Sequence, residues 1–155
     1  EKLHQAVDSA DSFEDKLKKY FEVMVHFYIA NSTLWQIICF EMLGGNNGCR
    51  VEPDGDNFKV ISRYNSVKVS EETSERILRY HKILHDEYDI LAQLITKAMQ
   101  DNLLKEDTVP EITTKFVFFG VAMSIFNQSD DIAADMTDEE AARIITDHFL
   151  RGNAR

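Results

Sequence analysis

The sequence predicts an all-helical fold, and three observations support this prediction. Apolar side chains recur at steps of three and four residues over long stretches, which is the spacing of a helix with one buried face. The chain of 155 residues contains only two prolines and six glycines, too few turn-forming residues for a typical β architecture. Helix-capping patterns precede apolar stretches, most clearly at residues 137–140. The length fits a single domain with a sizeable core.

The first third of the chain predicts three helices. A short one is expected over residues 1–10. Asp11 stands three residues before Glu14, which is a helix-start signature, and we expect a second helix with an aromatic-rich face from residue 13 to about residue 31. A third helix is expected over residues 33–43 because its apolar positions continue the helical spacing.

Residues 44–69 interrupt this pattern. Two turn clusters, one rich in glycine and asparagine and the other Pro53-Asp54-Gly55-Asp56, lie in this stretch. We expect residues 58–62 and 66–69 to pair as a small hairpin. A connection of this length inside a compact domain is usually functional or mobile.

The rest of the chain predicts three further helices. One long helix is expected over residues 70–100, ended by Asn102, which tolerates the left-handed backbone conformation of a C-terminal cap. A helix that opens on a proline follows over residues 110–128. The last helix begins at the capping box of residues 137–140 and is expected to end at Gly152.

The helix over residues 110–128 is the most informative of these. Residues 116–126 are apolar on every side, and such a helix must be buried all round. It is shorter than the roughly 20 apolar residues that span a bilayer. One way to cover it in a small domain is a second copy of the chain, so we expect a homodimer. The expected interface residues are Phe118, Gly120, Val121, Ile125, Ile145 and Phe149.

Charge and cysteine content limit the classes of function. The formal net charge of −10 argues against direct binding of nucleic acid by this chain, because phosphates require a basic surface. Two cysteines make no disulfide framework, which favours a reducing cytoplasm. No membrane-spanning or signal-peptide pattern is present in the sequence, and we expect no membrane contact.

Aromatic, Met and other apolar side chains on several helices form the candidate ligand pocket. Core packing explains most of them one by one, because each such buried side chain contributes roughly 1.5–3 kcal/mol. Collectively, tyrosine hydroxyls within apolar surroundings are typical of a small-molecule site. Glu41 would pair with a cationic or hydroxylated ligand if it points inward, and is an ordinary solvated residue if it points outward. The candidate residues are Phe21, Met24, Tyr28, Trp35, Glu41, Tyr80, Leu84, Tyr88, Phe116, Phe119 and Met123.

Catalytic and metal-binding patterns are weak. His81 and His85 are one helical turn apart, a spacing that can chelate a metal, with His26 as a third candidate ligand. Lys82 stands where a zinc-protease helix has its glutamate, and any two helical residues four apart share a face. We therefore expect no metal, no cofactor and no enzyme, with a metal-dependent helical-bundle enzyme as the rival hypothesis.

The order of these elements resembles the regulatory half of TetR-family transcriptional regulators. Residues 1–7 resemble the start of the family's linker helix, and Asn31-Ser32-Thr33-Leu34-Trp35 resembles its next interhelical turn. Residues 98–107 and 144–152 are similar to the C-terminal part. Asn102 stands where the family usually has Gly, and the connection at 44–69 is longer than the family pattern.

The resemblance implies a mechanism. The last two helices of each subunit would form a four-helix bundle across a two-fold axis, and a small-molecule effector would bind between the inner helices. The effector would bias the linker helix and so the binding of operator DNA by an N-terminal helix-turn-helix head, which we expect to be absent from this chain. The alternative is a stand-alone helical ligand-binding or scaffold module that does not act on DNA.

Overall fold

The computed structural model describes residues 2–33, 49–55, 57–62, 68–126 and 136–155. Over these residues the chain is largely helical, with a small two-stranded sheet. It divides into two compact units. The helical unit comprises Glu1–Asn31 and Glu87–Arg155, and the hairpin unit comprises Ser32–Asp86. The predicted helix over residues 33–43 lies outside the described residues, except for Thr33.

Helices α1 (Lys2–Asp8) and α2 (Phe13–Ala30) begin the helical unit. The predicted cap was wrong by one residue, because Ser12 and not Asp11 occupies the N-cap position. The Ser12 hydroxyl accepts a hydrogen bond from the Asp15 amide at 3.0 Å, which satisfies one of the free N–H groups of the first turn. The helix ends at Ala30 with Asn31 as its C-cap, in agreement with the predicted end near residue 31.

Helix α4 (Glu71–Gln100) begins in the hairpin unit and ends in the helical unit. Its end confirms the prediction for Asn102, which has a φ of 58°. The Asn102 amide donates to the Met99 carbonyl at 3.1 Å and the Leu103 amide donates to the Ala98 carbonyl at 2.9 Å. This pair of bonds is a Schellman cap, which stops the helix and turns the chain.

Helices α5 (Pro110–Phe126) and α6 (Asp138–Asn153) complete the helical unit. The capping box of α6 is present as predicted: the Glu140 amide donates to the Thr137 hydroxyl, and the Thr137 amide donates to the Glu140 carboxylate. The hydrogen bonds that the Thr137 amide and hydroxyl donate to the carboxylate lower the pKa of Glu140. The predicted end at Gly152 was wrong, because α6 continues to Asn153 and is capped by Ala154.

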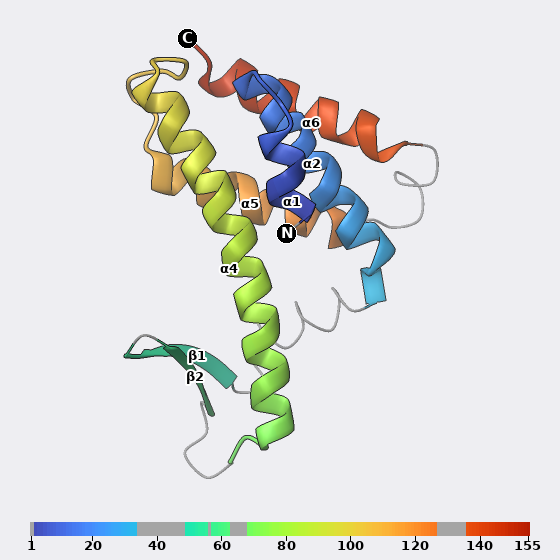
Figure 1. Ribbon diagram of the computed structural model, residues 1–155, viewed down its shortest axis with the longest axis vertical. Helices are drawn as coiled ribbons and strands as arrows, with labels where there is room; N and C mark the ends of the chain where they lie inside the picture. The colour runs from blue at the N-terminus through green and yellow to red at the C-terminus, as the bar shows by residue number, and fades with distance from the viewer. Residues whose placement is uncertain (1, 34–48, 56, 63–67, 127–135) are drawn as a thin grey trace. The chain divides into compact units, whose positions relative to one another are not determined.

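Helix α6 packs along α2 (Figure 1). Its buried positions Ala142, Thr146 and Phe149 recur at helical spacing, and the Phe149 ring meets the Phe13 ring edge-on at 6.3 Å. Helix α1 also packs on α2 and buries Leu3 and Val7. Helix α2 therefore packs against both the first helix, α1, and the last helix, α6.

The hairpin unit contains strands β1 (Cys49–Asp54) and β2 (Asn57–Ser62), which pair antiparallel. The predicted strand at 58–62 is confirmed, but its predicted partner at 66–69 was wrong. The turn cluster after Pro53 connects the strands directly, and Gly55 has a φ of 63°, a conformation that glycine adopts without a steric penalty. Across the part of the chain that the structure describes, no helix is long and apolar enough to cross a membrane.

The Asn102 cap makes a stability prediction. We expect Asn102→Ala to lower the free energy of unfolding by about 1 kcal/mol, because a Cβ-bearing side chain without Asn's local hydrogen bonding is strained at positive φ. Asn102→Gly, the matched control, should leave it unchanged or raise it. Urea unfolding followed by circular dichroism measures both. Equal losses in the two variants would contradict this role for the backbone conformation.

Candidate functional site

The candidate pocket residues on α2 lie in the core of the helical unit. Phe21, Met24 and Tyr28 share one face of α2 and are buried, together with Tyr20. The Tyr20 and Phe21 rings meet edge-on at 5.3 Å. In this chain these side chains fill the interior, which agrees with the core-packing interpretation of each residue.

Two buried tyrosines on α2 bind the same residue of α4. The Tyr20 hydroxyl donates to the backbone carbonyl of Glu87 at 3.0 Å, and the Tyr28 hydroxyl donates to the Glu87 carboxylate at 2.8 Å. Burial, together with the charge of Glu87, raises the pKa of Tyr20 well above its usual value. The Tyr20 hydroxyl therefore remains a protonated donor, and Glu87 is a polar group that both tyrosines contact.

A second aromatic group joins α4 to α5. The Tyr88 and Phe118 rings meet edge-on at 5.7 Å, and Phe118 meets Phe119 at 5.4 Å. Burial, with the nearby charge of Glu111, raises the pKa of Tyr88. Tyr88 lines a small open cleft of about 290 Å³, at the lower end of the size range of ligand sites. The rest of its lining is Ala92, Thr96, Pro110, Glu111, Thr114 and Lys115.

Four side chains of α5 differ in burial from what their sequence assignment requires. Phe118 and Val121, expected in the dimer interface, are buried inside the chain. Phe116 and Phe119, expected in the ligand pocket, are 77% and 51% exposed. Periodicity could not distinguish these faces, because α5 is apolar on every side. Gly120 is exposed as the interface prediction requires, and Met123 is half-buried.

The remaining candidates divide between the two units. Phe149 is buried against Phe13 and Ile145 is half-buried, both on α6. Tyr80 and Leu84 are half-buried on the part of α4 that belongs to the hairpin unit. Trp35, Glu41 and the side chain of Ile125 lie outside the described residues.

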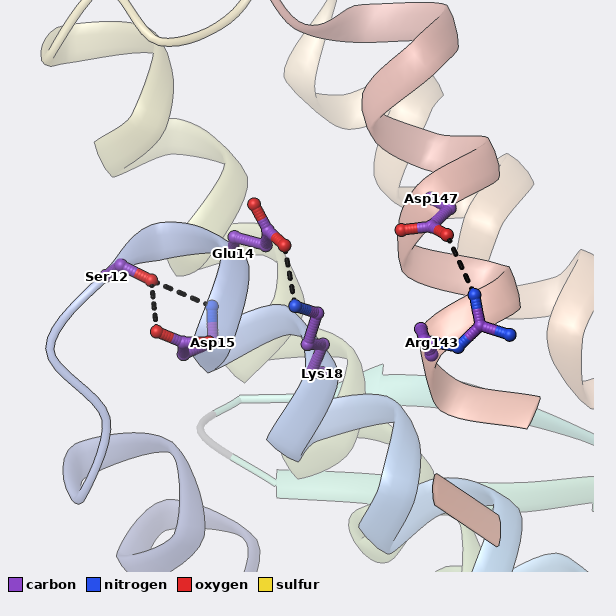
Figure 2. Close-up of polar contacts among 6 residues, drawn as sticks. All are labelled: Ser12, Glu14, Asp15, Lys18, Arg143 and Asp147. Carbon is purple, nitrogen blue, oxygen red and sulfur yellow. Dashed lines mark hydrogen bonds and ion pairs between the residues drawn. The ribbon is translucent and has the colours of Figure 1, made fainter. Parts of the chain in front are cut away.

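Charged side chains line the surface where α2 and α6 run together. Figure 2 shows Lys18 paired with Glu14 at 2.6 Å and Arg143 paired with Asp147 at 3.3 Å, each within its own helix. These exposed pairs contribute little to stability. An open cleft of about 760 Å³ lies among them. Since its cations already pair with neighbouring carboxylates, it is best described as a solvated charge network.

A buried hydroxyl lies on the face of α6 that packs on α2. Thr146 is fully buried, and within the described residues its Oγ1 has no hydrogen-bond partner. Thr114 on α5 is equally buried, but its Oγ1 donates to the Pro110 carbonyl at 2.7 Å. The two threonines differ in whether their polar group is satisfied.

The hairpin unit contains the candidate metal ligands His81 and His85. Their rings are 5.9 Å apart, and the Phe58 ring of β2 lies 4.6 Å from His81. The Nδ1 atom of His26 is hydrogen-bonded to the Asp138 carboxylate on α6, at 2.8 Å. Among the residues that the structure describes, no three His, Cys, Asp or Glu side chains are grouped so that they could hold a metal ion.

Sequence reasoning missed several residues that the geometry brings forward. Glu87 and Tyr20 escaped because their hydrogen bond joins residues 67 positions apart. Val109 and Ile112 escaped as interface candidates although they are 49% and 55% exposed. Periodicity gave no signal that this side, and not the side of Phe118 and Val121, is exposed, because α5 is apolar on both sides.

No protein-family model, curated protein or solved structure matches this chain. Its function is therefore inferred from the geometry described above and from the order of its helices.

The two buried threonines predict opposite responses to the same substitution. Thr146→Val removes an unsatisfied hydroxyl at constant shape and should raise the free energy of unfolding by about 1 kcal/mol. Thr114→Val, the matched control, removes a satisfied hydroxyl and should lower it by about 0.5–1 kcal/mol. Urea unfolding tests the pair, and a loss of stability in Thr146→Val would contradict the assignment.

The contact between Phe58 and His81 leads to a prediction for the pKa of His81. Burial, together with the charge of His85, lowers the pKa of His81 below its ordinary value of 6.5. The folded state therefore favours the neutral His81 ring. The stability that this ring contributes is fully present above about pH 6.5 and is lost as the pH falls through the lowered pKa. Phe58→Ala should raise the pKa of His81 toward 6.5 in an NMR titration.

Lys59→Ala is the control for this titration. Lys59 follows Phe58 on β2, so its side chain points to the opposite face of the hairpin, where it pairs with Asp54 at 3.3 Å. This variant should leave the His81 midpoint unchanged. An unchanged midpoint in Phe58→Ala as well would show that the ring does not shield His81.

Proposed function

We propose that this chain is the effector-sensing and homodimerising domain of a TetR-type transcriptional regulator, most simply a repressor. The observation that carries the proposal is the exposed apolar side of α5 on an otherwise well-packed helical unit. The order of the described helices supports it, because a short first helix packs on α2 and a long α4 precedes two closing helices. In this proposal the domain binds an effector and does not catalyse a reaction, and the protein is cytoplasmic.

The exposed side of α5 favours a second copy of the chain. It presents Ile112, Phe116 and Phe119, with Val109 directly before the helix, and each of these side chains is about half exposed or more. A covered phenylalanine buries roughly 150–250 Å², so this patch extends over a few hundred Å², the size at which an exposed apolar surface marks an interaction site. Homodimers with two-fold symmetry are the commonest assemblies of soluble proteins.

The effector site is proposed around the shared contact of α2 and α4. Tyr20, Tyr28 and Glu87 supply polar atoms within aromatic surroundings, which is the usual composition of a small-molecule site. Because α1 packs on α2 through Leu3 and Val7, a ligand that moves α2 also acts on α1. In the complete regulator α1 would carry the effect to an operator-binding head.

Two experiments test the effector and operator parts. Native mass spectrometry of the purified chain should show a small molecule bound to the dimer. The gene upstream of residue 1 should encode a basic helix-turn-helix segment of about 45–50 residues. An upstream sequence without such a segment would favour the stand-alone binding module instead.

The dimer part makes a mutational prediction. Phe116→Asp should weaken self-association by about 100-fold, because it places a charge at the centre of the proposed interface. Light scattering should then give the mass of one chain, and circular dichroism should show that the variant keeps its helical content. Glu111→Gln, an exposed position on the same helix but outside the apolar side, is the control and should remain dimeric. A Phe116→Asp variant that stays fully dimeric would contradict the proposal.

A further inference from the structure

Three aromatic rings join the hairpin to the first half of α4 (Figure 1). The Phe58 ring of β2 lies 4.6 Å from the His81 ring and 6.0 Å from the His85 ring, and the two imidazoles are 5.9 Å apart. All three residues belong to the hairpin unit. His81 is half-buried, whereas His85 is exposed. His81 is therefore the imidazole that the Phe58 ring shields from water.

The face of the hairpin that carries Phe58 is uncharged at its described side chains. Residues directly opposite each other in an antiparallel pair share a face, and so does every second residue along a strand. The described residues on this face are Val51, Pro53, Phe58, Val60 and Ser62. Glu52, Asp54 and Lys59 lie on the opposite face. The side of the hairpin that meets His81 thus offers no carboxylate to balance a charge on the ring.

We propose that the hairpin docks on α4 through a proton-sensitive contact: the Phe58 ring packs on neutral His81 and separates from it when His81 takes up a proton. A protonated imidazole under the Phe58 ring would lose part of its hydration without gaining a counter-ion, which is unfavourable. The proposal concerns the hairpin unit alone. It goes beyond the proposed regulator, because it requires neither an effector nor a second copy of the chain.

The charged groups of α4 act in the same direction. The neighbours of His81 on the helix surface, three and four residues away, are Ile77, Leu78, Leu84 and His85. His85 is the titratable one of these four, and its charge adds to the effect of burial in lowering the pKa of His81. At the same spacings from His85 stand Lys82 and Asp89, which have opposite charges. On α4, therefore, no carboxylate neighbours His81 at these spacings.

A cation–π attraction between protonated His81 and the Phe58 ring would act in the opposite direction. It would strengthen the contact in acid, whereas the loss of hydration weakens it. The half-burial of His81, the uncharged hairpin face and the nearby His85 favour the second effect. The sign of the pH response distinguishes the two.

NMR spectroscopy of the full chain tests the proposal. The nuclear Overhauser effect between the Phe58 and His81 rings measures docking, and we expect it to be strongest above about pH 6.5. Below this pH the equilibrium constant for docking should fall by up to about tenfold per pH unit until the lowered pKa of His81 is reached, because one proton is taken up. Hydrogen-exchange protection of the β2 amides should fall in parallel, since an isolated two-stranded hairpin is only marginally stable.

Three variants assign the proton to His81. His81→Leu removes the titrating group and keeps a side chain that can pack on Phe58, so protection of β2 should no longer depend on pH. His85→Leu removes the neighbouring charge and should reduce the size of the pH response. His4→Leu, the matched control, removes an exposed histidine from α1 of the helical unit and should leave the response unchanged. Circular dichroism checks that each variant is folded.

Each other outcome overturns the proposal. Docking that strengthens in acid would mean that cation–π attraction holds the hairpin. Docking of the unchanged protein that does not vary with pH would remove the proton-sensitive contact, and this measurement depends on no variant. A response that persists in a folded His81→Leu variant would assign the proton to another group. None of these results bears on the dimer or on the effector site, which are tested separately.

Discussion

The burial of one wide face of α2 is the constraint on which the helical unit depends. Six side chains of this helix are buried: Leu17, Tyr20, Phe21, Met24, Val25 and Tyr28. Helices α1, α5 and α6 pack on α2, and two tyrosine hydroxyls bind it to Glu87 of α4. Each neighbour covers part of an apolar surface that α2 cannot expose to water. The aromatic face of α2 is therefore first a structural requirement, and any binding role is added to it.

The same constraint determines which side of α5 faces water. Phe118, Val121 and Ala122 are buried within the unit, and among the described residues none covers the opposite side of this helix, which is apolar all round. An exposed apolar side of this kind is typical of an interaction surface. The uncovered side is thus a consequence of composition and not of irregular packing.

Much of the fold could be predicted because local interactions decide it. The Asn102 turn and the Thr137–Glu140 capping box depend on residues within five positions of each other, and both were predicted correctly. Ser12 and Asp11 both suit an N-cap, so the sequence could not choose between them. The hairpin was half predicted, since strand composition indicated β2 but did not select its partner. The partner is determined by the turn at Gly55, which connects β1 directly to β2.

The site was less predictable, because it depends on which side of a helix faces inward. Every position from 116 to 126 is apolar or small, so periodicity could not decide which of Phe116 and Phe118 faces inward. Glu87 follows no motif, and only the positions of Tyr20 and Tyr28 on another helix give it a role. Long-range contacts of this kind leave no local pattern in the sequence.

In the proposed regulator, the path from effector to linker helix runs through α2 itself. Tyr28 lies near the end of this 18-residue helix, and its hydroxyl is 2.8 Å from the Glu87 carboxylate. A helix moves largely as one body, so a ligand that displaces this contact also shifts the surface on which Leu3 and Val7 pack. Coupling requires that the ligand bind one arrangement better than the other. A ligand that competes with Tyr28 for Glu87 meets this requirement, because it cannot bind equally well where that hydrogen bond is intact.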